Sequence, residues 1–417
     1  MSRLALTRRR LLALGAGAAL LPRRVFGDGG TGDRKFLFVF CPGGWDPTYV
    51  FAPTFGSPQI DMEDGSAPAE TNGIAFVDAA TRPAVRGFFE KYGDRTCIIN
   101  GFESRSVAHD VCRHLTMTGS TLPGKDDWAA IMAHHAADDP LIPYMHISGP
   151  AYSDAYGSDM VLVGDQGQFT SLIDGTCLTT ATPAVAVPTK AVSDLEDAYV
   201  LARAREFAAS AGRGRAASLG GFAVSTEEDV ASVLAAGNSL AIDGATLSGG
   251  LTTLIQSFSR KIARCGMIQH NGYNNWGWDT HASNNIQSLH FQELFSALTT
   301  AADNMRALPG DRGTLLDDVT IVVMSEMGRY PQLNAFGGKE HWTFTSCMLI
   351  GGGIRGGQVV GEYDDQLGGR QVDLGTGEVV EGGTDLLPGH IGATLLTLAD
   401  VDPAEYLDEP AISAVLA

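Results

Sequence analysis

Short, uninterrupted apolar runs recur along the chain, each bounded by polar or glycine-rich sequence. The clearest is KFLFVFC, Lys35 to Cys41, which follows charged residues and is followed by Pro42, Gly43 and Gly44. A continuous apolar run of this length is typical of a strand that is buried on both faces. Comparable runs, each expected to form a strand, are found at Thr96–Asn100, Met160–Val163, Gly266–His270, Val319–Met324 and Ser346–Ile350.

Helical patterns separate several of these runs, and alternating strands and helices predict a mostly parallel sheet covered by helices. From about residue 190 to 262 the pattern changes to Ala- and Leu-rich helical segments, in which Ser193 with Glu196 and Thr226 with Asp229 have the spacing of capping boxes. We therefore expect one α/β domain over residues 33–417, with a helical insertion at about 190–262.

The first 27 residues have a different pattern. Arg8, Arg9 and Arg10 precede a small and apolar run from Ala13 to Leu21. This arrangement predicts a twin-arginine signal peptide over residues 1–27, and therefore export of the folded protein to the periplasm or beyond by the twin-arginine machinery. The apolar run is much shorter than the roughly 20 residues that span a bilayer as a helix, so we expect no permanent membrane anchor.

The net charge of the chain limits the kinds of molecule that it is expected to bind. Residues 1–27 contain six of the 29 Lys and Arg residues and none of the 48 acids, so the remainder has a formal net charge of 23 − 48 = −25. Such a surface repels phosphate backbones and anionic lipid, which argues against nucleic acid as a partner. The six cysteines show no Cys-x-x-Cys spacing, so we expect most of them to be buried apolar residues, with one or two disulfides left open.

Polar residues that directly follow the apolar runs are the candidates for chemistry, because ligands gather at the carboxyl ends of parallel strands. Asp46, Asp279 and Glu326 supply carboxylates, and His281 and His341 supply imidazoles. This nitrogen and oxygen set suits a divalent ion, which would also neutralise the repulsion between the acids. Taken singly, Asp46 before Pro47 could instead build a turn, and His281 could cap a helix.

The order and spacing of several segments resemble a known family. FLFVFCPGGWD, GWDTH, VTIVVMSEMGR, GKEHW and GGGIRGGQVVGEY are similar to those of the family called domain of unknown function 1501, which is placed within the alkaline phosphatase and sulfatase-like superfamily. The resemblance implies an alkaline-phosphatase-like three-layer α/β/α sandwich and a divalent metal such as zinc, manganese, calcium or magnesium. In that alignment Asp46, Asp279, His281, Glu326 and His341 take the positions of metal ligands.

The segment from His109 to Gly119 is similar in spacing to the sulfatase motif that carries the nucleophile, with Arg113 and Thr118 at matching positions. His109 stands where the superfamily has a nucleophilic Cys, Ser or Thr, and Met327 stands where it has a second-metal histidine. We expect His109 to act as a metal ligand or general base rather than as a nucleophile. Arg113 could pair with a tetrahedral anion, as could Arg329, although either could form a salt bridge within the fold.

Two functions remain open at the level of sequence. The first is an exported, metal-dependent hydrolase that acts on an anionic phosphate or sulfate ester. The second is a non-catalytic, metal-stabilised binding or scaffold protein on the same fold, which the residues at positions 109 and 327 favour. A dinucleotide site is not expected, because the Gly351 to Gly356 match to G-x-G-x-x-G leads into a β-like segment at Gln358 rather than a helix.

Overall fold

The computed structural model of the chain describes residues 33–164, 189–210, 216, 240 and 242–417. The predicted signal peptide, the Thr226 capping box and Cys177 lie outside these residues. No helix among the described residues is long and apolar enough to cross a membrane.

An eight-stranded sheet organises the molecule, and all six predicted strands belong to it. The strand β13 is antiparallel to both of its neighbours, whereas every other pairing in this sheet is parallel. The two other strands have three residues each: β14, which is the β-like segment at Gln358, and β5, which was not predicted. In spatial order the strands are β14 (Gln358–Val360), β4 (Thr96–Glu103), β13 (Phe344–Gly351), β10 (Val319–Met324), β1 (Lys35–Phe40), β7 (Cys265–Gln269), β5 (Tyr144–His146) and β6 (Met160–Leu162).

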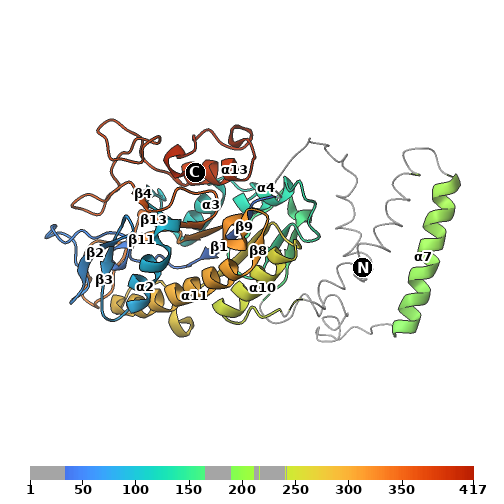
Figure 1. The fold of residues 1–417 in the computed structure, drawn as a ribbon, viewed down its shortest axis with the longest axis horizontal. Helices are drawn as coiled ribbons and strands as arrows, with labels where there is room; N and C mark the ends of the chain where they lie inside the picture. Colours follow the sequence, from blue (N-terminus) through green and yellow to red (C-terminus); the bar gives the residue numbers. More distant parts are fainter. Residues whose placement is uncertain (1–32, 165–188, 211–215, 217–239, 241) are drawn as a thin grey trace, which may run out of the picture.

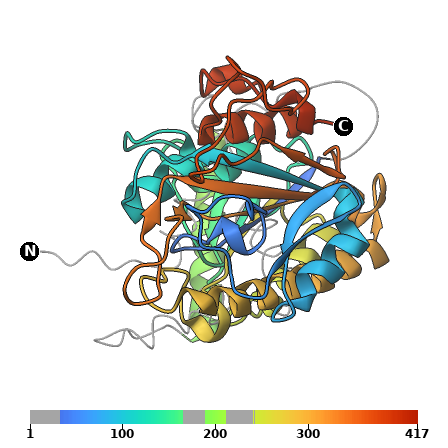
Figure 2. The same ribbon diagram turned by 90° about the vertical axis from the view of Figure 1, so that its left-hand side faces the viewer.

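Both faces of the sheet are covered by helices, which gives the expected three layers (Figures 1 and 2). The side chains of β1 alternate between two cores: Leu37 and Val39 pack in one, Phe36 and Phe38 in the other. The first core contains residues of α2 (Pro83–Tyr92), α10 (Leu247–Ser259) and α11 (Gln287–Ala307), and the second contains residues of α3 (His109–Thr118), α4 (Trp128–His134) and α13 (Pro388–Leu398). The α/β class with a mostly parallel sheet is therefore confirmed.

Smaller elements complete the chain. Three hairpins lie outside the main sheet: β2 (Ala67–Thr71) with β3 (Ile74–Asp78), β8 (Pro309–Gly310) with β9 (Gly313–Thr314), and β11 (Gly328–Arg329) with β12 (His341–Trp342). The short helix α12 (Leu315–Asp318) leads into β10.

In the described part of the expected helical insertion, the helices α7 and α10 differ in character. Helix α7 (Lys190–Ser210) lies apart from the sheet in Figure 1. Helix α10, in contrast, buries Leu251, Leu254 and Phe258 in the same core as α11. The residues of α10 are thus part of the layer that covers the sheet, because their apolar face packs in the same core as α11.

The described cysteines are buried and unpaired, as expected for small apolar residues. Cys41, Cys97, Cys112, Cys265 and Cys347 all have free thiols. Burial raises the pKa of the Cys41 thiol, and the charge of Glu326 adds to this effect.

Candidate metal centre

Four strands bring the candidate residues to one edge of the sheet. Because β4, β10, β1 and β7 run in the same direction, the segments that follow them emerge together. Asp279 follows β7, Glu326 follows β10, and His109 follows β4 as the first residue of α3. His341 reaches the same place from β12, which pairs with β11 directly after Glu326.

His109, Asp279 and His341 form the cluster that could hold a metal, since each offers a ligand atom within 4.8 Å of the other two. Nε2 of His109 lies 3.3 Å from Oδ2 of Asp279, and Nε2 of His341 lies 3.1 Å from Oδ1. A third imidazole, that of His281, places its Nε2 at 3.2 Å from the same Oδ1 and at 3.0 Å from Nε2 of His341.

The other nitrogen of each ring has a separate acceptor. Nδ1 of His109 is 2.9 Å from Oε1 of Glu326, Nδ1 of His341 is 2.7 Å from the carbonyl oxygen of Val107, and Nδ1 of His281 is 2.7 Å from Oε2 of Glu340. Because carboxylate and carbonyl oxygens only accept, each Nδ1 donates its proton. When the rings are neutral, their free lone pairs are therefore on Nε2, and an Nδ1 that is held by an acceptor is the second-sphere arrangement that orients histidine ligands on metals.

The side chains of the cluster would interact more favourably with a divalent cation than they do with one another. Nε2 of His109 is buried and has no hydrogen-bond partner among the described residues, and a buried polar atom without a partner is costly. If both rings are neutral with the proton on Nδ1, His281 and His341 present lone pairs to each other at 3.0 Å and repel. A cation between these nitrogens and the Asp279 carboxylate would satisfy all of them.

Arg329 fixes the Asp279 carboxylate. Its guanidinium is fully buried and donates to the carbonyl oxygens of Gly43, Gly44, Trp278 and Lys339, and to Oδ1 of Asp279 at 2.6 Å. Burial would raise the pKa of Asp279, but the hydrogen bond and charge of Arg329, followed by the hydrogen bond of His341, lower it to about 2. Asp279 is consequently ionised, and Arg329 positions it and is not available for an external anion.

The pKa of His109 is shifted in the opposite direction. The hydrogen bond to Glu326 raises it, burial works against this, and the charges of Glu326 and Asp279 raise it further. Glu326 itself is held by the backbone N–H of Gly43, 2.8 Å from Oε1, and by the hydroxyl of Ser325, 3.2 Å from Oε2. Glu326 therefore orients His109 from behind the cluster.

Gly43 permits the close approach of β1 and β7 at this edge. Its φ is +120°, and a Cβ at this position would lie 2.6 Å from the backbone nitrogen of Asp279. A larger residue would have to displace the segment that carries Asp279.

Asp46 does not join the cluster, contrary to the expectation for a metal ligand. Its side chain is completely buried, with Oδ1 accepting from the backbone and hydroxyl of Thr48, and Oδ2 accepting from Asn284 at 2.7 Å and from Lys339 at 2.8 Å. Asp46 also caps the short helix that begins at Pro47. The turn-building alternative therefore describes its role, because every lone pair already has a protein partner.

Arg113 and Met327 also lie outside the cluster. Arg113 pairs with the exposed Asp110 at 2.6 Å, on the surface of α3, and Met327 is fully buried beside Gly44. Four other histidines have partners of their own: His114 contacts the carbonyl of Ser120, His146 that of Gly149 and His290 that of Gly277, while His134 contacts Asp159.

Two partners of the cluster could not be singled out from the sequence. Val107 contributes a backbone carbonyl, which any residue would supply. Glu340 directly precedes His341 in the sequence, but its carboxylate contacts His281 instead. The sequence does not indicate that Glu340 contacts His281. The contact depends on the loop between β11 and β12, which brings Glu340 to His281.

Comparison with known proteins supports the resemblance seen in the sequence. Residues 253–377 match the family described as Protein of unknown function (DUF1501). This match includes Asp279, His281, Glu326 and His341, and leaves His109 outside it. Among curated proteins, none matches the chain significantly.

Several solved structures are remotely similar. A protein of the alkaline phosphatase superfamily from Vibrio parahaemolyticus has 9% identity and a TM-score of 0.37, with 95% of this chain and 76% of that chain covered. Lipooligosaccharide phosphoethanolamine transferase A from Neisseria meningitidis has 10% identity and a TM-score of 0.42, with coverage of 96% and 63%. The PsFucS1 sulfatase from Pseudoalteromonas has 10% identity and a TM-score of 0.39, with coverage of 98% and 76%. Likeness at this level identifies no activity.

Proposed function

We propose that this protein is an exported, metal-dependent hydrolase of phosphate or sulfate esters. The observation that carries the proposal is the set of three imidazoles whose Nε2 atoms converge on Asp279 while each Nδ1 is held by an acceptor. An arrangement that leaves Nε2 of His109 buried without a partner is expensive for a purely structural cluster.

His109, Asp279 and His341 would hold the ion, with His281 beside them. Zinc or another ion that prefers nitrogen ligands suits this set better than calcium or magnesium, which prefer oxygen. When bound, such an ion polarises an ester oxygen and lowers the pKa of a water molecule.

Other groups of the protein would orient the metal ligands and bind the anionic ester. Arg329 and Glu326 hold Asp279 and His109 in place, and the half-exposed Asp279 leaves the cluster open to solvent. The first turn of α3 begins at His109, so its free backbone N–H groups and helix dipole favour an anion at this site. Arg113, one turn along α3, could leave its exposed pairing with Asp110 to contact the anion.

Water is the expected nucleophile. Within the described chain, the side-chain hydrogen bonds of His109, Asp279, His281 and His341 include no serine, threonine or cysteine side chain. Hydrolysis would therefore proceed by direct attack of water on phosphorus or sulfur, with departure of the alcohol and without a covalent enzyme intermediate.

One observation favours a second candidate, a metal-stabilised binding protein without activity. The buried Met327 and the absence of a hydroxyl or thiol partner at the described cluster remove features on which a covalent mechanism depends. Metal uptake without ester cleavage would identify this alternative.

The test combines metal analysis with an ester panel. Mature protein loaded with zinc or manganese should contain one ion per chain and should cleave at least one aryl phosphate or aryl sulfate. The Asp279→Asn variant should lose both properties, whereas Asp46→Asn should retain the ion. Failure of the wild type to take up any divalent ion would overturn the proposal.

Export requires its own test. If Arg8 and Arg9 belong to a twin-arginine signal, lysine at both positions should leave the precursor in the cytoplasm, because the transport machinery reads this pair. Fractionation followed by immunoblotting measures the distribution. Unchanged export of the double variant would contradict the assignment of residues 1–27.

A further inference from the structure

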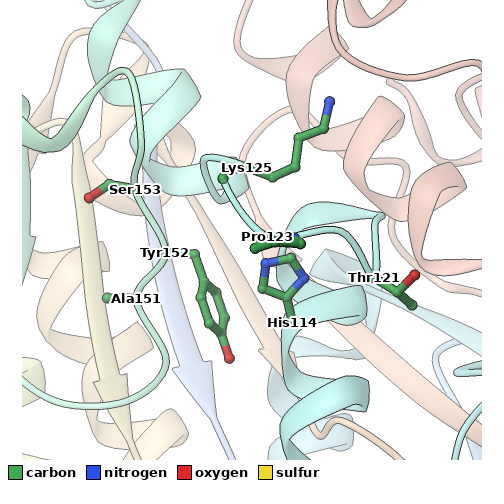
Figure 3. Close-up of a pocket in the computed structure, with 8 residues that line it drawn as sticks. His114, Thr121, Pro123, Lys125, Ala151, Tyr152 and Ser153 are labelled. Atoms are coloured by element: carbon green, nitrogen blue, oxygen red, sulfur yellow. The ribbon is translucent and has the colours of Figure 1, made fainter.

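The helices α3 and α11 both begin at the edge of the sheet that carries the metal cluster, and they contribute to it differently. On α3, His114 follows His109 by five residues and is rotated by about 140° around the helix axis. Its ring faces that of Tyr152 across a cavity of about 370 Å³ instead of facing the cluster (Figure 3). The first residue of α11, Gln287, directs its side chain toward the segment that carries Asp279.

The amide of Gln287 is completely buried, and both of its polar atoms have partners. Its Oε1 accepts from the backbone N–H of Asp46 at 2.6 Å. Its Nε2 lies 2.9 Å from Oγ1 of Thr280, 3.1 Å from the carbonyl oxygen of Trp278 and 3.2 Å from that of Gly44. The orientation of the amide is fixed by these partners, because a backbone N–H only donates and a carbonyl oxygen only accepts.

Two of these partners lie on either side of Asp279. Trp278 directly precedes Asp279 and Thr280 directly follows it, so the Gln287 amide holds both residues that flank the carboxylate. The chain from Asp279 to Gln287 also contains His281, and the contacts of Gln287 close this stretch into a short loop. The place of the Asp279 carboxylate therefore depends on the first residue of α11.

Arg329 holds the same two carbonyl groups as Gln287. Its Nε donates to the carbonyl oxygen of Gly44 at 2.8 Å, and its Nη2 donates to that of Trp278 at 3.1 Å. The same Nη2 is 2.6 Å from Oδ1 of Asp279. Because the guanidinium and the amide share their acceptors, removal of the amide should also change the position of Arg329 and, through it, of the Asp279 carboxylate.

A buried glutamine is unfavourable here unless its hydrogen bonds matter. Removing an amide from water and fixing a long side chain both cost free energy, and a methionine would fill nearly the same volume without polar atoms. We propose that Gln287 is a positioning residue of the metal centre, which sets the place of Asp279 through Trp278 and Thr280 before an ion binds. The inference rests on the metal site of the proposed function, and it does not depend on ester cleavage.

The zinc affinity of the Gln287→Met variant tests this role. The affinity should fall about tenfold, at the lower end of the range for groups that act through a ligand. The visible absorption spectrum of the cobalt-substituted variant should also differ from that of the wild type, because this spectrum follows the geometry of the ligands. A purely structural role would lower the stability of the variant and leave both properties of the folded protein unchanged.

Gln292→Met is the matched control, because it makes the same substitution on the same helix. Oε1 of Gln292 accepts from the backbone N–H of Ala84 at 2.9 Å, and its Nε2 contacts Ser296. These contacts lie outside the cluster. The control variant should therefore keep the zinc affinity and the cobalt spectrum of the wild type.

The contact can also be removed from its other side, which covers the case that Gln287→Met does not fold. Thr280→Val keeps the shape of the side chain but lacks the hydroxyl that accepts from Nε2 of Gln287. It should lower the zinc affinity severalfold. Where Gln287→Met folds, the double variant should bind zinc no more weakly than the effects of the two single variants combined, since the two changes remove a shared contact.

The outcomes separate this role from the proposed hydrolase. Wild-type zinc affinity and an unchanged cobalt spectrum in folded Gln287→Met, or in Thr280→Val if the former does not fold, would overturn the positioning role even if an ester is cleaved. If no ester is cleaved but zinc binding weakens in Gln287→Met and not in Gln292→Met, the hydrolase function fails and the positioning role stands. Wild-type protein that takes up no divalent ion would overturn both.

Discussion

Two segments of this chain have the same three residues, Gly44-Trp45-Asp46 and Gly277-Trp278-Asp279, and lead from the neighbouring strands β1 and β7. Their indoles are fully buried and contact each other edge to face, with centroids 6.4 Å apart. The two aspartates nevertheless differ in environment. The Asp46 side chain is completely buried, whereas that of Asp279 is 45% exposed.

The partners of the two carboxylates explain what each can do. Asp46 is saturated by Thr48, Asn284 and Lys339, so it has no lone pair to offer and acts as a structural anchor. Asp279 is held by Arg329 on one side and faces the Nε2 atoms of His109 and His341 on the other. A polar side chain at a strand end is thus structural when hydrogen bonds within the protein occupy all its lone pairs. It is available to bind a ligand when they do not.

The largest expected effect is on metal content. Asp279→Asn or His341→Ala should abolish the binding of one ion per chain, because each removes a proposed direct ligand. The loss should exceed the 10- to 100-fold decrease in affinity that is typical of second-sphere changes. Equilibrium dialysis with elemental analysis measures it, and retention of the ion by both variants would remove the distinction between the two aspartates.

The second effect is on stability, and it should appear at the other aspartate. Asp46→Ala leaves Lys339 buried without its counter-charge, which should lower the free energy of unfolding by about 3–5 kcal/mol. Denaturant titration of metal-free protein is the measurement. Because Asp46 is outside the cluster, the folded variant should still bind one ion; a variant of normal stability that has lost the ion would reverse the two assignments.

A smaller effect is expected from Glu326→Gln. The amide keeps the shape of the side chain but binds His109 less strongly, so metal affinity should fall by about 10- to 100-fold without loss of folding. Glu362→Gln, which alters an exposed pair with Arg370, is the matched control and should leave the affinity as it is. Equal affinities in the two variants would show that Glu326 does not orient a ligand.

The smallest effect concerns pH. Since Glu326 raises the pKa of His109, protons compete with the ion above the ordinary histidine value of about 6.5. Affinity should increase as the pH rises through the raised pKa, by at most about tenfold per pH unit for one competing proton, and then level off. In Glu326→Gln the inflection should move to lower pH. An affinity that does not depend on pH around neutrality would exclude His109 as a ligand.

The sheet was largely predictable because its central strands are buried on both faces and read as continuous apolar runs, such as KFLFVFC. Strand β5 was not predicted, because its three residues, Tyr144–His146, do not form a continuous apolar run. The rule that ligands gather at strand ends located the region of the site. It could not separate Asp46 from Asp279, since the difference comes from Lys339 and Asn284, which lie more than 200 residues further along the chain. The contact of Glu340 with His281 likewise depends on a loop that no sequence pattern specifies.

The position of the bound ion tests the account most directly. Crystals of the mature protein soaked with zinc, measured at the zinc absorption edge, should give an anomalous peak about 2.0–2.2 Å from Nε2 of His109, Nε2 of His341 and a carboxylate oxygen of Asp279. A peak at the Asp46 carboxylate, or no peak among these residues at saturating zinc, would contradict the assignment of Asp279 as the chemical centre of the molecule.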